Sequence, residues 1–190
     1  MRFEVISYSS KAGMELNCDS VAWLDREDCV SAVICTAAND NAESVLKAKK
    51  LSGDTMERIY PCSSAEEAEE VCKAVNCSGV EGAVTLAVRD DCAVWQCFGS
   101  AAIYLFSEGK IQKTAGEEKQ VCGKKMLKEG DALLLCSNGF HSHISETEMD
   151  IDLHRAKNAA DWLENMLVRQ LSESGAAGKS ISVLLCMVKN

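Results

Sequence analysis

The chain has 190 residues, of which 47% are hydrophobic and 26% charged, as is usual for a globular protein with one sizeable core. Its net charge of −9 argues against nucleic acid and anionic membranes as partners. No apolar run approaches the ~20 residues that span a bilayer, and the N-terminal segment lacks the apolar stretch and cleavage site of a signal peptide. These features predict a cytoplasmic protein.

The eleven cysteines do not form a disulfide or zinc pattern. Their number is odd, the chain has no C-x-x-C pair, and the spacings of Cys72/Cys77 and Cys92/Cys97 suit a zinc knuckle poorly. Most of them lie inside apolar runs, where a thiol behaves as a small hydrophobic side chain. We interpret them as core residues.

Strand and helix patterns alternate in blocks along the first half of the chain. Residues 3–10, 20–25 and 29–37 are rich in strand formers. Residues 41–51 have helical spacing, and residues 63–76 form a clearer helix that Ser63 or Ser64 can cap. The apolar stripe of this second helix comprises Ala65, Ala68, Val71, Cys72 and Val75.

The second half begins with strands. Residues 82–90, 92–109 and 110–114 read as an antiparallel meander, with turns at Asp90-Asp91 and Glu108-Gly109. A buried strand at 131–139, a helix at 157–173 and a last strand at 180–188 follow. The apolar face of that helix comprises Ala159, Ala160, Trp162, Leu163, Met166, Leu167 and Leu171. This order indicates an α+β fold in which helices pack outside two antiparallel sheets.

Four phrases follow one another along this pattern. They are G-M-E-L-N-C-D at 13–19, F-G-S-A-A-I-Y-L at 98–105, G-D-A-L-L-L-C-S-N-G at 130–139 and K-S-I-S-V-L-L-C-M-V at 179–188. In order and content they resemble the metal-dependent protein phosphatases of type 2C, whose third phrase reads L-L-L-C-S-D-G. The resemblance covers almost the whole chain, and it implies one domain over residues 1–190 with a four-layer αββα sandwich.

In that family two Mg²⁺ or Mn²⁺ ions are held by carboxylates and activate a bridging water, while an arginine binds the substrate phosphate. The resemblance implies where these roles fall in this chain. The arginine falls on Met14, and a neighbouring glutamate on Cys18. The ligand aspartates fall on Asp19, on Cys35 or Thr36, on Ser100, on Asn138 and on Lys179.

Only Asp19 therefore keeps a carboxylate, and Lys179 brings a positive charge. Losing several negative charges removes the main attraction for divalent ions, so no metal cofactor is expected. We predict a catalytically inactive pseudophosphatase that binds a protein partner, such as a kinase or a phosphoprotein. The alternatives are a divergent active phosphoserine/phosphothreonine phosphatase that uses Mg²⁺ or Mn²⁺, and a purely structural subunit.

Between Thr114 and Gly130 only fifteen residues, 115–129, remain. The family has a long loop and a helical flap beside its active site at this point. We therefore expect a domain that lacks the flap.

Other polar groups allow a second interpretation. His141 and His143 could form a metal pair on a strand, but a surface loop is the simpler interpretation because further ligands are missing. Asp19 could bind a cation weakly, although a turn residue that accepts hydrogen bonds from backbone amides is favoured. Cys18 or Cys35 could be a thiol nucleophile, but the sequence places no activating histidine near them.

Overall fold

A computed structural model describes residues 1–26, 28–116, 119–173 and 178–189. In these residues, ten strands form two antiparallel sheets of five strands each. The order in sheet A is β1 (Arg2–Ser10), β10 (Ile181–Lys189), β9 (Ala132–Cys136), β6 (Ala102–Ser107), β7 (Lys110–Ala115). The order in sheet B is β2 (Asp19–Arg26), β3 (Cys29–Ala37), β4 (Val80–Arg89), β5 (Cys92–Gly99), β8 (Val121–Met126).

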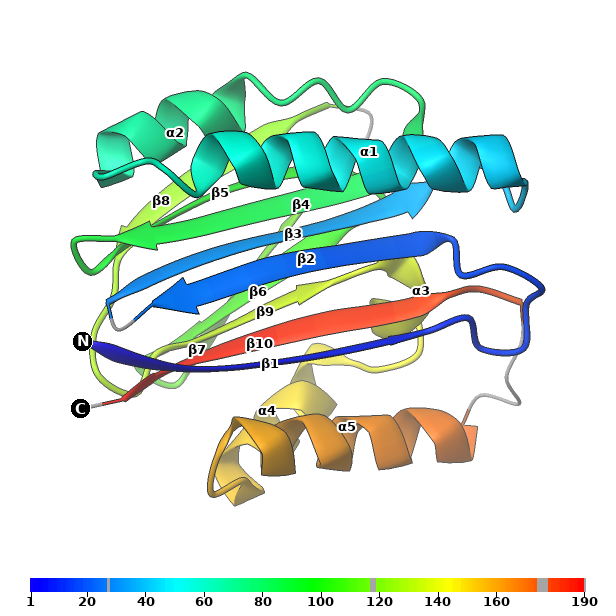
Figure 1. Cartoon of the computed structure of the whole chain (residues 1–190). Coiled ribbons are helices and arrows are strands. Elements are labelled where there is room, and N and C mark those ends of the chain that lie inside the picture. Colours follow the sequence, from blue (N-terminus) through cyan, green and yellow to red (C-terminus); the bar gives the residue numbers. More distant parts are fainter. Residues whose placement is uncertain (27, 117–118, 174–177, 190) are drawn as a thin grey trace.

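Helices cover both outer faces of this sandwich (Figure 1). Helices α1 (Ala42–Ile59) and α2 (Ala65–Lys73) pack on sheet B. Helices α4 (Glu146–Arg155) and α5 (Ala159–Glu173) lie below sheet A, and the short α3 (Asn138–His141) follows β9. The expected four-layer αββα arrangement is confirmed.

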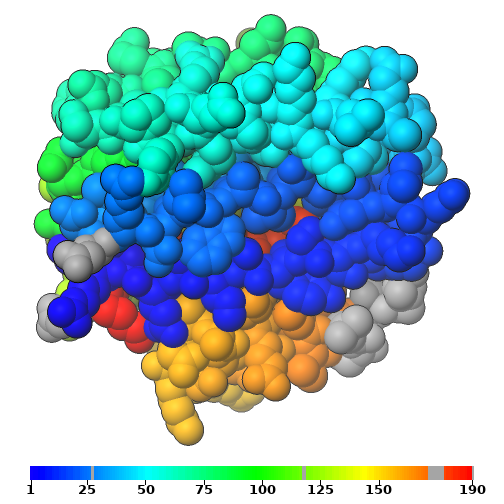
Figure 2. Space-filling model, in the orientation of Figure 1, coloured from blue at the N-terminus to red at the C-terminus, as the bar shows by residue number. Residues whose placement is uncertain are grey.

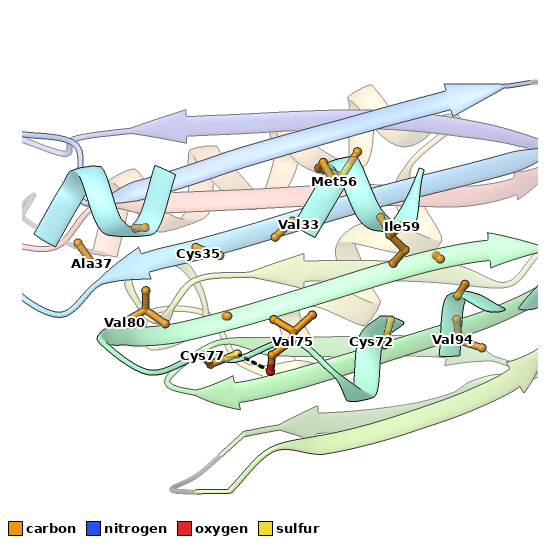
Figure 3. Close-up of a cluster of buried hydrophobic side chains, with 14 of the residues drawn as sticks. Val33, Cys35, Ala37, Met56, Ile59, Cys72, Val75, Cys77, Val80 and Val94 are labelled. Atoms are coloured by element: carbon orange, nitrogen blue, oxygen red, sulfur yellow. Dashed lines mark hydrogen bonds between the residues drawn. The ribbon is translucent and has the colours of Figure 1, made fainter. Parts of the chain in front are cut away.

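Three layers of apolar side chains pack between the two sheets and the two helical layers. The central one lies between the sheets and includes Ile34, Leu86 and Leu133, all fully buried. The layer between sheet B and its helices includes Val33, Cys35 and Ile59, which are drawn in Figure 3. The third layer packs α4 and α5 on sheet A around Phe106 and Trp162. The two rings meet edge to face, with their centroids 5.1 Å apart. Alternate residues of the central strands serve two different layers, which explains their nearly continuous apolar sequences.

Both sheets expose an edge on the same side of the molecule. Strands β1 and β2 are the outer strands of their sheets, and Figure 2 shows that they form the surface between the two helical layers. The Trp23 indole donates a hydrogen bond to the hydroxyl of Ser7 over 2.9 Å, which links the two edges.

The expected meander is only partly correct. Both turns are confirmed: Asp90, Asp91, Glu108 and Gly109 have positive φ, as the tight turns of two-residue hairpins require. The two hairpins belong to different sheets, however, because β4 and β5 pair in sheet B and β6 and β7 pair in sheet A. The chain crosses between the sheets after Gly99, whose φ is +61° and whose position leaves no room for a Cβ beside the Glu81 carbonyl.

Several element boundaries also differ from the expectation. Helix α1 continues past residue 51 to Ile59, although it contains Gly53, because its buried face continues through Thr55 and Met56. Strand β8 and helix α4 were not predicted, because β8 lacks an apolar alternation and α4 has a mostly polar sequence. In α5 the Ala160 side chain is exposed, whereas the side chain of Leu171 lies outside the described residues. The cap of α2 is confirmed at Ser64, which accepts from the Glu67 amide.

All eleven cysteines are free thiols, and eight of them are buried. The interpretation of most cysteines as core residues is thus confirmed. Among the described residues, no helix combines the length and apolar character that crossing a membrane would require.

Candidate functional site

A cavity of about 200 Å³ opens at the end of the sandwich where β3, β9 and the segment before β10 meet. Sheet B contributes one wall through the end of β3 and the loop to α1, and sheet A contributes the opposite wall. Its lining residues are Met14, Cys18, Thr36, Ala37, Ala38, Asn39, Asp40, Glu81, Asn138, Gly139, Gly178, Lys179 and Ser180.

Five of the eight residues expected at the site line this cavity: Met14, Cys18, Thr36, Asn138 and Lys179. The two residues considered for one ligand position face different ways. Thr36 lines the cavity, whereas Cys35 is 1% exposed and packs into the layer under α1. Adjacent strand residues point to opposite faces, so only Thr36 can serve this site.

Asp19 lies directly behind Thr36. It is 4% exposed, and its Oδ1 accepts a hydrogen bond from the Thr36 hydroxyl over 2.7 Å. Burial raises the pKa of the Asp19 carboxyl, and the nearby hydroxyls of Thr36, Ser137 and Ser182 oppose that shift only in part. No hydrogen bond reaches Oδ2 from the described residues.

The expected role of Asp19 as a turn residue that accepts backbone hydrogen bonds is wrong. The turn is made instead by Asn17, whose Oδ1 accepts from the Asp19 amide over 3.1 Å. Asp19 begins β2 and pairs with Thr36 of β3, which directs its side chain between the sheets. It is a buried carboxyl group held by a threonine hydroxyl.

Asn138 and Lys179 form the wall contributed by sheet A. Asn138 is the first residue of α3 and is followed by Gly139. A Cβ at position 139 would lie 2.0 Å from the Ser180 carbonyl oxygen. This contact explains why glycine is needed after the buried strand. Lys179 is exposed and also lines the cavity.

Ser100 lies outside the cavity lining. Its carbonyl accepts a hydrogen bond from His141 Nε2 over 2.9 Å, and its buried hydroxyl has no partner among the described residues. Burial lowers the pKa of His141, so the neutral ring donates this bond. His141 is the half-buried last residue of α3 and His143 lies in the exposed turn after it, so the two do not form the strand pair considered above, and the surface-loop interpretation holds only for His143.

Cys18 is the cavity thiol. Burial raises its pKa, a hydrogen bond with Ser180 opposes that shift, and the charges of Asp19, Asp40 and Glu81 raise the pKa further. A nucleophilic thiol needs the opposite shift. The buried thiol of Cys35 also has a raised pKa, so neither cysteine is activated.

Two acidic residues of the cavity, Asp40 and Glu81, were not identified from the sequence. Asp40 belongs to the polar A-N-D-N run between β3 and α1, and Glu81 precedes Gly82 in β4. A polar run directly after a buried strand was the available signal for Asp40. Nothing in the sequence brings Glu81 to the same place, because strand pairing does so.

The donor set fits a pair of divalent ions poorly. Mg²⁺ and Mn²⁺ need several oxygen ligands converging on one point. Asp19 is buried beside hydroxyls, and Asp40 and Glu81 are exposed. Among the described residues, no three acidic, cysteine or histidine side chains gather closely enough to hold a metal.

Neither the protein-family models nor the curated proteins contain a match to this sequence. Solved structures do match. The Mycobacterium tuberculosis serine/threonine phosphatase PstP/Ppp has a TM-score of 0.79 at 11% identity, and each chain covers 100% of the other. A bacterial serine phosphatase has a TM-score of 0.81 at 12% identity, with 100% of this chain and 99% of that one covered.

RsbX, solved in complex with magnesium, has a TM-score of 0.75 at 11% identity, with 97% of this chain and 94% of that one covered. At such identities the similarity establishes the fold alone. The chain has the fold of these serine/threonine phosphatases over its whole length.

Proposed function

We propose that this chain, which has the fold of type 2C serine/threonine phosphatases, is a catalytically inactive pseudophosphatase that acts by binding another protein. The observation that supports this proposal most directly is the environment of Asp19. Of the positions where the family has metal ligands, Asp19 is the one that keeps a carboxylate in this sequence. It is buried, bound to a hydroxyl, and has a raised pKa. A metal ligand needs the opposite properties, since the cation must meet a deprotonated and accessible oxygen.

The phosphate site supports the same proposal. Met14 stands where the family has its arginine, and its sulfur lies 3.8 Å from the Ser180 hydroxyl. A thioether cannot replace the bidentate hydrogen bonds that a guanidinium gives to phosphate. Substrate binding and metal binding would thus be lost together.

A divergent active phosphatase is the competing proposal, favoured by the carboxylates of Asp40 and Glu81 at the cavity. Titration calorimetry with Mn²⁺ and a phosphopeptide hydrolysis assay with Mn²⁺ or Mg²⁺ separate the two. We expect neither heat of binding nor metal-dependent turnover. Turnover that Asp19→Ala abolishes would establish the active enzyme.

Partner binding is tested by affinity capture from cytoplasm of the source cells, followed by binding measurements with the purified candidate. A kinase or a phosphoprotein is the class of partner that we propose, and the cytoplasm is the proposed location. If no protein is captured and the purified chain shows a single species of constant mass in solution, the binding role is contradicted. Assembly into a larger complex without a regulatory effect would favour a structural subunit.

A further inference from the structure

We infer that the cavity at the end of the sandwich receives an arginine side chain of a protein partner, and not a phosphorylated side chain. This inference rests on the proposed binding function and names the chemistry of the contact. It follows from the acceptor atoms that the hydroxyls of the cavity wall offer and from the charges of its acidic side chains.

The hydrogens of the two wall hydroxyls are already directed to acceptors within the protein. The Thr36 hydroxyl donates to Asp19 Oδ1 over 2.7 Å. The Ser180 hydroxyl is directed to the sulfur of Met14 over 3.8 Å and accepts from the Cys18 amide over 2.8 Å. The lone pairs that remain on Thr36 can only accept from a group in the cavity.

The buried carboxyl group of Asp19 is a second, independent observation in favour of a hydrogen-bond donor in the cavity. Asp19 is 4% exposed, its Oδ2 accepts no hydrogen bond from the described residues, and its Oδ1 is bonded to Thr36 of the cavity wall. A donor placed on the Thr36 oxygen would extend a chain of hydrogen bonds that ends on this carboxyl. Such chains strengthen each of their bonds in a protein interior.

The charged groups of the wall add acceptors. Asp40 and Glu81 both line the cavity, and the ion pairs of the described residues involve other carboxylates. Among the described residues of the lining, Lys179 is the one cationic side chain. With two carboxylates against one ammonium, the wall attracts a cation and repels a phosphate.

A guanidinium suits this arrangement better than a metal ion does. Its five N–H groups spread over several ångströms, so they can reach acceptors that do not converge on one point. The apolar part of the wall, with Met14, Ala37 and Ala38, can cover the aliphatic stem of the side chain. The carboxylates at the rim then remain beside the charged head.

The test titrates ¹⁵N-labelled protein with three small probes and follows the amide signals by NMR. The probes are Nα-acetylarginine methylamide, its uncharged citrulline counterpart and phosphoserine methylamide. We expect only the arginine probe to shift the amides of residues 36–40, 81 and 178–180 in a saturable way. The double variant Asp40→Asn/Glu81→Gln should weaken its binding about tenfold, since two charge contacts are lost.

The matched control is Asp54→Asn/Glu57→Gln, which removes two exposed carboxylates of α1 outside the cavity lining and should leave the affinity unchanged. Equal binding of citrulline, binding of phosphoserine in the cavity, or an arginine affinity insensitive to the Asp40/Glu81 change would each overturn the inference. If a captured partner binds equally well to that double variant, the binding function stands and the arginine contact fails. Metal-dependent turnover would instead overturn the proposed function.

Discussion

Asp19 is a carboxyl group whose burial decides its chemistry. Its folded pKa is raised above the value of 3.8 that the unfolded chain would show, because burial disfavours the charged form. The folded state thus binds a proton more tightly than the unfolded state. Stability from this group is present at low pH and is lost as the pH rises from the unfolded pKa through the folded one.

We predict that Asp19→Asn removes this pH dependence. The amide keeps the acceptor for Thr36 and carries no charge, so the variant gains stability relative to the native protein as the pH is raised from about 4 to about 8. Denaturant unfolding at several pH values measures the difference. The exposed Asp54→Asn is the control, and a constant difference between native and variant protein over this range would contradict the assigned environment.

At this scale the sequence predicted which residue types stand at the site positions of the family that the chain resembles, but not how they are arranged. The change to Asn138 is visible in the phrase L-L-L-C-S-N-G, and Met14 is visible in G-M-E-L-N-C-D. The hydroxyls around Asp19 come from three different strand ends, at Thr36, Ser137 and Ser182. Only the pairing of β10 with β9 and of β2 with β3 brings them together, and that pairing is a property of the folded chain.

At the scale of elements, Arg89 fixes the C-terminal end of α1 to sheet B. It is 2% exposed, and its hydrogen-bond partners are carbonyls and one hydroxyl. They are Val30 O, Val88 O, Ser31 Oγ, Ile59 O, Tyr60 O and Cys62 O. The carbonyls at a helix C-terminus carry partial negative charge, so the guanidinium is balanced by the helix end.

We predict that Arg89→Met destabilises the protein by about 3 kcal/mol, since several buried carbonyls lose their donor at once. Chemical denaturation measures the change in the free energy of unfolding. Arg58→Met, at an exposed position in the last turn of α1, is the matched control and should change stability by less than about 0.5 kcal/mol. Similar losses in both variants would mean that Arg89 does not anchor the helix.

The elements that were predicted have strong periodic patterns, and those that were missed do not. The buried strands β3 and β9 and the helix α5 have clear apolar runs or stripes. Helix α4 has mostly polar residues and depends on its capping box at Ser145 and Glu148. Strand β8 is an edge strand whose side chains are largely exposed, so its sequence lacks alternation.

For the whole molecule, burial divides the cysteines into three classes. Eight thiols lie in the apolar layers or at their margins, Cys29 and Cys62 are half-buried, and Cys122 is exposed on β8. Burial raises the pKa of the Cys72 and Cys97 thiols to about 12. A thiol reacts as its thiolate, so these core groups are both inaccessible and protonated.

We predict that an aromatic disulfide reagent titrates one thiol of the native protein quickly and at most two more slowly. All eleven thiols should react once denaturant removes the three apolar layers. Cys122→Ser should abolish the fast phase and leave the unfolding free energy nearly unchanged, whereas Cys97→Ser places a hydroxyl in the core and should destabilise the fold by about 1–3 kcal/mol. Fast reaction of more than three thiols in native buffer would mean that the layers open readily. Because Cys72 lies between sheet B and α2 whereas Cys97 lies between the two sheets, the reaction rate of Cys72 also measures how often the helix separates from sheet B, and that of Cys97 measures how often the two sheets separate.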